Sequence, residues 1–309
     1  MSRVVVAIPS YRRPQGLERL LRALAALTTG AELRILVADN DMVRNDGLAT
    51  VARMRSPPYR WPLEAISVAE RGIAQVRNAL LTHALDNYDT DYLAMLDDDE
   101  WPDTDWLEHF LAVAQTTGAD ALHGAVLPDF EVKPGCWAGT CRGLSPWRGN
   151  TGPVPMIHST SNVLIRRDVL APLVRPYFDS RFALSGGEDK DFFTRLAIAG
   201  AKFAWADDAI VHAHVPASRS NPRWALQRAF RIGNSDMRVL IKHDSGILSR
   251  AREGTKIAGA LILSLAAAPL LAPVASRRMA PLCKFARAAG KLAAICGARY
   301  DEYAVTHGR

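Results

Sequence analysis

Leu93-Ala94-Met95-Leu96-Asp97-Asp98-Asp99-Glu100 is the stretch around which the chain is organised, because four apolar residues run directly into four acids. The apolar half predicts a short, buried strand. The acids then lie at the carboxyl end of that strand, where a parallel sheet opens its ligand crevice. Crowded carboxylates repel one another unless a cation offsets their charge. The stretch therefore predicts either a Mg²⁺ or Mn²⁺ site completed by substrate phosphates, or a solvated acidic turn before a helix near Asp105.

Strands and helices alternate on both sides of this stretch. Val4–Ile8 is a β-branched strand, residues 13–27 have a helical period, and Leu33–Ala38 forms the next strand. This order is that of a βαβ unit. It predicts an α/β fold with a mostly parallel, Rossmann-like sheet flanked by helices. Residues 128–157 are rich in Gly, Pro and Trp and are expected to form an irregular loop or lid. Residues 41–62 are also expected to form a loop-rich crossing, and residues 202–205 and 210–214 two short strands.

The last quarter of the chain differs from the rest in charge and composition. Residues 1–218 carry 22 Lys and Arg against 27 Asp and Glu, a net charge of −5, whereas residues 219–309 carry 16 against 5, a net charge of +11. Ile257–Val274 is a run of 18 uncharged residues with basic residues on both sides. Its length is near the lower limit for a membrane span, and the symmetric basic flanks favour an interfacial or re-entrant hairpin.

These features suggest two domains: an α/β domain of residues 1–220, which would carry any ligand site at the sheet edge, and a helical tail of residues 221–309 on an anionic membrane surface. A helical pair buried against the soluble domain is the alternative for the tail. Nucleic acid is not expected as a partner, since the chain has no zinc finger or RNA-binding aromatic motif. The four cysteines do not form a framework, and no signal peptide is expected, which favours the cytoplasmic face of the inner membrane. The oligomeric state is not indicated.

Four polar stretches need one explanation, and three of them directly follow predicted strands. They are Pro9-Ser10-Tyr11-Arg12-Arg13, Asp39-Asn40, Asp97-Asp98-Asp99 and Gly186-Gly187-Glu188-Asp189-Lys190-Asp191. The carboxyl ends of parallel strands meet at one edge of the sheet, so these residues are expected to converge. With Glu70-Arg71-Gly72-Ile73-Ala74-Gln75-Val76-Arg77-Asn78-Ala79, they resemble the family-two glycosyltransferases over residues 3–240. These are inverting enzymes of the GT-A fold, and the closest resemblance is to those that build succinoglycan-type exopolysaccharides on a polyprenyl carrier.

The resemblance implies a nucleotide-sugar site, with a UDP-hexose as the expected donor. It assigns cofactor contacts to Pro9, Ser10, Tyr11, Arg13, Asp39, Asn40, Arg71, Arg77, Asn78, Asp97 and Asp98. Tyr11 is expected to stack on the base, and Asp39 to accept hydrogen bonds from the base or ribose. The alternative for Asp39 is an Asx-turn that closes the strand, and for Arg71, Arg77 and Asn78 a solvated helix face.

The resemblance also implies a divalent metal, Mn²⁺ or Mg²⁺. Asp97 and Asp99 match the two acids of a D-x-D motif: Asp99 is expected to contact the metal, Asp97 the metal or the ribose, and Asp98 to point away towards the sheet edge. His212 is the first choice for a third ligand, with His214 facing the opposite way on the same strand. A structural hydrogen-bonding role is the alternative for either histidine.

Inverting transfer needs a general base on the acceptor hydroxyl. The resemblance gives this role to Asp189, with Glu188 orienting the acceptor or the base; a helix-capping run of acids with Asp191 is the alternative. The expected reaction moves a hexose to a hydroxyl of a polyprenyl-diphosphate-linked glycan. Two other functions stay open from the residues alone. A metal-dependent nucleotidyltransferase would need a Gly- and Lys-rich phosphate loop after the first strand, and a non-catalytic sugar-binding scaffold would have lost these acids.

Overall fold

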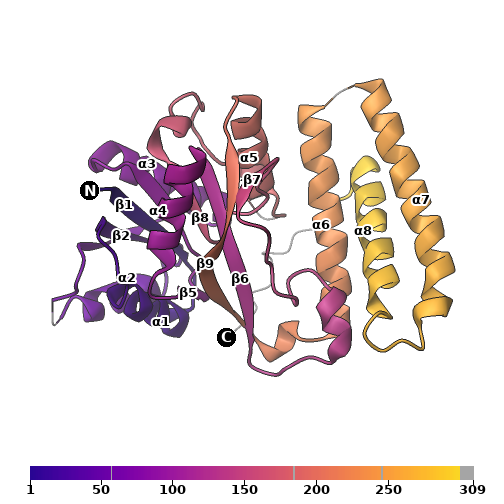
Figure 1. Cartoon of the computed structure of the whole chain (residues 1–309), viewed down its shortest axis with the longest axis horizontal. Coiled ribbons are helices and arrows are strands. Elements are labelled where there is room, and N and C mark those ends of the chain that lie inside the picture. Colours follow the sequence, from indigo (N-terminus) through magenta and orange to yellow (C-terminus); the bar gives the residue numbers. More distant parts are fainter. Residues whose placement is uncertain (57, 184, 245, 300–309) are drawn as a thin grey trace.

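The computed structural model describes residues 1–56, 58–183, 185–244 and 246–299. Within these residues, nine strands form one sheet with helices on both faces, and a layer of three further helices stands beside it (Figure 1). The strands are β1 Arg3–Ser10, β2 Glu32–Asp39, β3 Leu63–Ser67, β4 Tyr92–Met95, β5 Glu100–Pro102, β6 Ala121–Phe130, β7 Gly152–Val154, β8 Val163–Arg166 and β9 Phe203–Val215. The helices are α1 Pro14–Ala25, α2 Asp46–Met54, α3 Ile73–Asn87, α4 Trp106–Thr117, α5 Glu188–Ile198, α6 Pro222–His243, α7 Ile247–Leu271 and α8 Met279–Ile295.

The sheet has the order β3-β2-β1-β4-β8-β6-β9-β5, and β7 pairs with β9. Strands β3, β2, β1 and β4 are parallel, whereas β8 runs antiparallel between β4 and β6. The chain builds outward from β1 in one direction through β2 and in the other through β4. A crevice therefore opens where β1 and β4 end side by side, and this is the edge that receives Ser10 and the acid turn.

Alternate residues of β1 enter two separate cores. Val4, Val6 and Ile8 pack with leucines of α1 and aromatic residues of α4 on one face of the sheet. Val5 and Ala7 pack with α3 and α5 on the other face. Because both faces of β1 are covered, its sequence is an uninterrupted apolar run rather than an alternating one.

Two local features differ from the sequence-based prediction. Residues 41–62, expected as a loop, contain α2, whose first turn is held because Gly47 and Leu48 donate backbone hydrogen bonds to Asp39 Oδ2 at 2.8 and 3.1 Å. The two short strands expected near 202–205 and 210–214 are one continuous strand, β9, which pairs in parallel with β6 around an irregularity between Gly124 and Val126.

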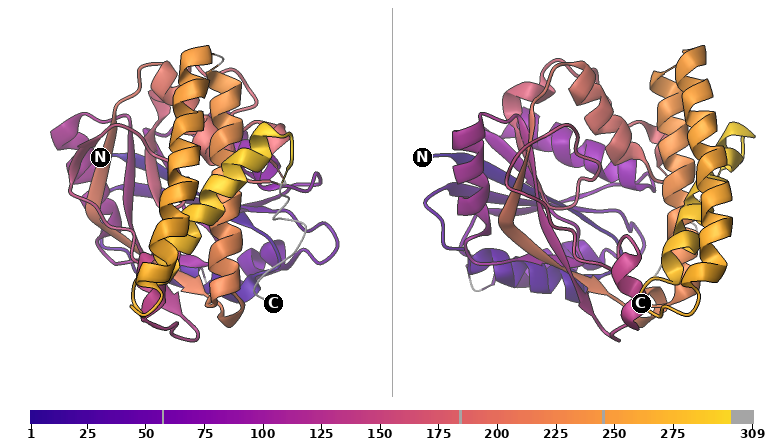
Figure 2. Two further views of the ribbon diagram at one scale, coloured as in Figure 1. Left: turned by 90° about the vertical axis from the view of Figure 1, so that its right-hand side faces the viewer. Right: turned by 45° about the vertical axis from the view of Figure 1, so that its right-hand side comes forward.

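Helices α6, α7 and α8 form the layer beside the sheet, and α8 crosses α6 obliquely (Figures 1 and 2). Two glycines permit this crossing. A Cβ added to Gly233 on α6 would lie 1.9 Å from Arg287 O, and one added to Gly290 on α8 would lie 1.9 Å from Phe230 O. Any side chain at either position would push the two helices apart.

Helix α7 is the outermost element of this layer (Figure 2). Leu248–Leu271 is long and apolar enough to cross a membrane, and only 11% of its most apolar window is buried. Ile262, Leu263, Leu265 and Leu270 are each more than 60% exposed. Within the tail, α8 packs on α6, while α7 leaves an apolar face uncovered and is a candidate element for membrane association.

Candidate functional site

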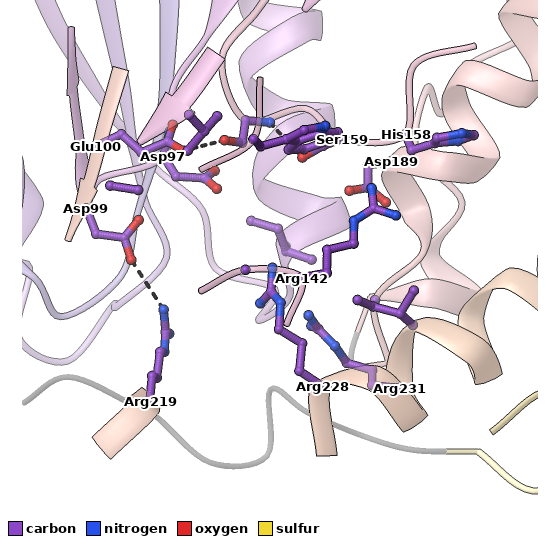
Figure 3. Close-up of a pocket in the computed structure, with 18 of the residues that line it drawn as sticks. Asp97, Asp99, Glu100, Arg142, His158, Ser159, Asp189, Arg219, Arg228 and Arg231 are labelled. Carbon is purple, nitrogen blue, oxygen red and sulfur yellow. Dashed lines mark hydrogen bonds and ion pairs between the residues drawn. The ribbon is translucent and has the colours of Figure 1, made fainter. Parts of the chain in front are cut away.

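A cavity of about 810 Å³ lies between the carboxyl edge of the sheet and the helices α6 and α8. Figure 3 shows that carboxylates lie along one side of it and arginines along the other. Of the residues singled out from the sequence, the following line it: Pro9, Ser10, Tyr11, Arg13, Asn40, Arg71, Arg77, Asp97, Asp98, Asp99, Glu188 and Asp189. The fold therefore brings the four polar stretches to one place.

The acid turn after β4 is neutralised by arginines of the chain itself. Asp98 is buried, accepts a hydrogen bond from Tyr11 N at 3.1 Å and pairs with Arg13 Nη1 at 2.9 Å. The same Arg13 nitrogen lies 2.8 Å from Asp99 Oδ2, and Arg219 lies 3.6 Å from that oxygen. Burial raises the pKa of Asp98 to about 6. Both carboxylate oxygens of Asp98 thus hold the loop after β1 in place.

Arg77 joins the acid turn to the first turn of α5. Its guanidinium lies 2.5 Å from Glu188 Oε1 and 3.3 Å from Asp97 Oδ1, and both Arg77 and Glu188 are almost fully buried. A buried arginine between two carboxylates fixes their separation, because the planar fork donates in defined directions. The two acid motifs are therefore one connected unit.

Glu188 and Asp189 are adjacent in sequence but differ in environment. Gly186 and Gly187 have φ angles of 73° and 102°, which lets the chain turn sharply into α5. Glu188 turns to Arg77, whereas Asp189 lines the cavity beside His158 and Arg142 (Figure 3). Burial, and next the charge of Asp189, raise the pKa of Glu188 to about 7; burial also raises the pKa of Asp189.

The opposite end of the cavity is formed by the loop after β1 and the segment before α3. The ring of Tyr11 lies 5.4 Å from the Arg71 guanidinium, a cation–π distance. Asn40 donates to Val68 O and Glu70 O and accepts from Gly72 N at 2.9 Å. Asn40 thereby holds the segment that presents Arg71 next to Tyr11.

Two predicted nucleotide contacts lie outside the cavity lining. Asp39 is buried and accepts three backbone hydrogen bonds, one of them from Asp41 N, which is the Asx-turn given as its alternative. Asn78 exchanges two hydrogen bonds with the backbone of Phe178. Both side chains are occupied by hydrogen bonds within the fold.

Of the two histidines of β9, His214 lies at the cavity, and not His212, which was the predicted metal ligand. His212 stacks on Trp101, and its Nε2 lies 2.9 Å from Asp103, outside the cavity lining. His214 lines the cavity, and its backbone N–H donates to Asp99 O at 2.8 Å. Alternation along the strand separated the two residues correctly, but the pairing of β9 with β5 decides which one faces inward.

With this geometry in view, similar proteins identify the family. The model of the family "Glycosyl transferase family 2" matches residues 5–172, more than half of the chain. The chain belongs to glycosyltransferase family 2. It is 34% identical over 303 residues to the succinoglycan biosynthesis protein ExoM of Rhizobium meliloti (strain 1021), covering 96% of this chain and 94% of that protein. It is 27% identical to the glycosyltransferase AglE of Haloferax volcanii, covering 76% and 73%.

Solved structures agree on the fold of this glycosyltransferase. The mannosyltransferase PcManGT of Pyrobaculum calidifontis, in complex with GDP-Man and Mn²⁺, superimposes with a TM-score of 0.59 at 19% identity, covering 94% of this chain and 87% of that one. TarS 1–349 of S. aureus, in complex with UDP, gives 0.52 at 16% identity, covering 96% and 92%. These similarities confirm the GT-A fold expected from the sequence.

The side chains that line the cavity can be compared with the ligands that the expected divalent metal ion needs. Among the described residues, no three His, Cys, Asp or Glu side chains gather closely enough to hold a metal alone. Asp97, Asp99 and His214 nevertheless line one wall of the cavity. The carboxylate oxygens of Asp97 and Asp99 suit Mg²⁺ or Mn²⁺ when substrate phosphates supply the remaining positions. The site therefore fits an ion that arrives with, and is completed by, a diphosphate.

Sequence reasoning missed the basic wall of the cavity in this glycosyltransferase. Arg142 comes from the loop after the 3₁₀ turn Cys136–Thr140, Arg228 and Arg231 from α6, and Arg287 from α8. The available signal was the spacing of Arg228 and Arg231, three residues apart on one helix face. Such a pair more often marks a solvated face, and only the fold turns it towards the cavity.

Proposed function

We propose that this family 2 enzyme is an inverting, metal-dependent hexosyltransferase. It moves a hexose from a UDP-sugar to a hydroxyl of a polyprenyl-diphosphate-linked glycan during synthesis of a bacterial surface or exported polysaccharide. The observation that carries the proposal is the position of Asp189, which lines the same cavity as Asp97 and Asp99 but starts a different element (Figure 3). A base and a diphosphate-binding wall that face one space are what direct displacement requires.

In the proposed reaction, the acceptor oxygen attacks the anomeric carbon as Asp189 takes its proton. The bond between that carbon and the diphosphate breaks on the opposite face, so the sugar configuration inverts and UDP leaves. Burial raises the pKa of Asp189, so its carboxylate takes up a proton more readily, as a general base must. Glu188, held by Arg77, positions the first turn of α5.

Asp97, Asp99 and His214 would hold Mn²⁺ or Mg²⁺, which offsets charge on a leaving diphosphate when bound. Arg13 and Arg219 already lie beside Asp99 and add fixed positive charge there. Tyr11 and Arg71 are proposed to hold the base and Ser10 to frame the ribose, while Asn40 holds the segment that carries Arg71. TarS binds UDP and PcManGT binds GDP-Man and Mn²⁺, which supports a nucleotide sugar and a divalent ion as the ligands.

The polyprenyl acceptor is supported by the relative ExoM, a succinoglycan biosynthesis protein, and by the tail. The exposed residues Ile262, Leu263 and Leu265 of α7 would enter the interface of the inner membrane from its cytoplasmic face. Basic residues at both ends of α7 would lie on anionic headgroups. Replacing these three residues with serine should abolish flotation with vesicles that contain phosphatidylglycerol. Unchanged flotation of the triple variant would refute this attachment.

The two other functions considered from the sequence are not favoured. Family membership argues against a nucleotidyltransferase, and a scaffold would not need Asp97, Asp99 and Asp189 in one cavity.

A donor screen tests the proposal. Full-length protein is incubated with a panel of UDP- and GDP-sugars, Mn²⁺ or Mg²⁺, and membranes that carry lipid-linked glycans, and nucleoside diphosphate release is measured. We expect release with a UDP-hexose that depends on the membranes, stops in excess EDTA and is lost in Asp189→Asn. Release that persists in EDTA would refute the metal dependence, and no acceptor-dependent release with any donor would refute the function.

A further inference from the structure

Helix α6 packs against the turn that carries the proposed base, Asp189. Ser235 on α6 is buried, and its hydroxyl donates a hydrogen bond to Gly186 O at 3.1 Å. A Cβ added to Gly187 would lie 3.0 Å from the Cβ of Ser235, so the backbone of the turn lies directly against α6. The two residues that precede Glu188 are therefore held by the helical layer.

The next residue of α6, Asp236, holds the other side of the same turn. Asp236 Oδ1 lies 2.5 Å from Lys190 Nζ, and Lys190 directly follows Asp189 in the first turn of α5. The backbone N–H of Lys190 donates to Asp189 Oδ1 at 2.7 Å. Lys190 thus contacts the proposed base through its main chain and α6 through its side chain.

Asp236 is itself fixed by α8. Its second oxygen, Oδ2, lies 2.5 Å from Arg287 Nη2, and its side chain is only 12% exposed. Burial opposes ionisation of Asp236, but the charges of Lys190 and Arg287 outweigh it and lower the pKa of this carboxyl. Charge-assisted hydrogen bonds of this kind are stronger than neutral ones. One carboxylate therefore links α5, α6 and α8.

The first turn of α5 is consequently fixed from two sides. On the sheet side, Glu188 pairs with Arg77 at 2.5 Å, and on the helical side Lys190 pairs with Asp236. Asp189 lies between these two anchored residues and lines the cavity. A reacting group needs such support, because a displacement of about 1 Å can lower a rate by about 10²-fold.

We propose that Asp236 is a positioning residue for Asp189, acting through Lys190, and that α6 and α8 are therefore needed for sugar transfer as well as for the tail. Without this link, the first turn of α5 would be held by an ion pair on the sheet side alone. The inference rests on the proposed function, because it takes Asp189 as the base.

Amide hydrogen exchange of the full-length protein tests the link without any ligand. Asp236→Asn keeps the size of the side chain but removes its charge. Exchange in residues 186–191 should become roughly tenfold faster, the effect of losing one charge-assisted hydrogen bond. Asp236→Glu keeps the charge and should retain part of the protection. Unchanged exchange in β1 would show that the variant is not destabilised as a whole.

Glu253→Gln is the matched control. Glu253 on α7 also has a side chain that is 12% exposed, and it also pairs with two cations, Lys256 at 3.2 Å and Lys291 of α8. It lies outside the cavity lining. Its loss removes a comparable ion pair from the same helical layer, so exchange in residues 186–191 and the transfer rate should both stay unchanged.

Transfer kinetics separate position from charge. Asp236→Asn should lower kcat by about tenfold to 10²-fold and leave UDP affinity unchanged. Lys190→Met should also lower kcat, although it removes a charge of the opposite sign. The double variant should be little slower than either single variant, because both changes break one ion pair. A direct effect of charge on Asp189 would instead change kcat in opposite directions in the two single variants.

Three results would overturn the proposal: unchanged exchange in residues 186–191 of Asp236→Asn, faster exchange there with unchanged kcat, or opposite changes of kcat in Asp236→Asn and Lys190→Met. A wild type that transfers no sugar in the donor screen would refute the proposed function. The link between α5 and α6 would still be decided in that case, since exchange needs neither donor nor acceptor.

Discussion

The two ends of the cavity use the same residue types in opposite ways. At the sheet end, Arg13 and Arg77 are committed to Asp98, Asp99, Asp97 and Glu188, and each arginine holds carboxylates in position. At the helical end, Asp236 pairs with Lys190 and Arg287, and Arg142 lines the cavity. Arginines thus hold carboxylates in place at the sheet end, whereas at the helical end they form the wall of the cavity. The comparison suggests that the sheet end is the fixed part of the site, with Asp189 at the boundary between the two ends.

The largest expected effect concerns the two adjacent acids at this boundary. Asp189→Asn keeps the size of the side chain but cannot accept a proton, so kcat should fall by about 10²- to 10⁴-fold, the usual contribution of a general base. UDP affinity should change little, because Asp189 is proposed to contact the acceptor. The measurement pairs the transfer rate with UDP titration on the same variant.

Glu188→Gln is the matched comparison for Asp189→Asn. It should lower kcat less, because Glu188 already accepts a hydrogen bond from Arg77 and would only position the helix. A larger loss in Glu188→Gln than in Asp189→Asn would exchange the two roles. Loss of UDP affinity in Asp189→Asn would place that residue on the donor side and remove the boundary.

The sheet end was predictable from the sequence because its signals are local. An apolar run that ends in acids predicts both the buried strand β4 and the position of Asp97, and the paired glycines before Glu188 predict the sharp turn. The alternation of β9 likewise separated His212 from His214. It did not show which one faces inward, because that depends on strand pairing between residues far apart in the chain.

The helical end was not predictable because its residues are brought together only by tertiary packing. Arg142 and Arg228 are separated by the whole of β8, α5 and β9. Each lies in a segment where a basic residue is ordinarily solvated. Helix α2 was missed for a related reason: it is short, and its first turn is stabilised by Asp39 from the preceding strand rather than by its own composition.

The second effect is a pH dependence that arises at Glu188. Its pKa rises from an ordinary 4.5 to about 7 on folding, mainly through burial, so the native state binds this proton more tightly than the unfolded state. The free energy of unfolding should therefore decrease as the pH rises from about 4.5 to 7, by up to about 3 kcal/mol from this group. Glu188→Gln should lose this component in denaturant titrations across that range. Parallel pH profiles of the variant and the wild type would contradict it.

The third prediction concerns the close crossing of α6 and α8, which two glycines permit. Gly290→Leu places a side chain against Phe230 O and should destabilise the protein by about 1–3 kcal/mol, the usual cost of overpacking. UDP binding should persist, because the proposed donor contacts lie at the sheet end of the cavity.

Gly259→Ala is the control for this crossing. Gly259 lies on α7, where an added Cβ meets no atom within 4 Å, so alanine should leave UDP binding unaffected and raise helix stability slightly. Loss of UDP affinity in Gly290→Leu would mean that the cavity responds as one unit, and the division into two ends would fail.

The smallest expected effect concerns Tyr11, at the sheet end of the cavity. Tyr11→Leu keeps an apolar side chain beside Arg71 but removes the ring that is proposed to stack on the base. An aromatic contact contributes about 0.5–1.5 kcal/mol beyond its buried area, so UDP affinity should fall by about twofold to tenfold. The maximal transfer rate should not change, since Tyr11 lies at the opposite end of the cavity from Asp189. If Tyr11→Leu lowered the maximal transfer rate as strongly as Asp189→Asn and left UDP affinity unchanged, Tyr11 would act at the reacting end, and the division of the cavity into two ends would fail.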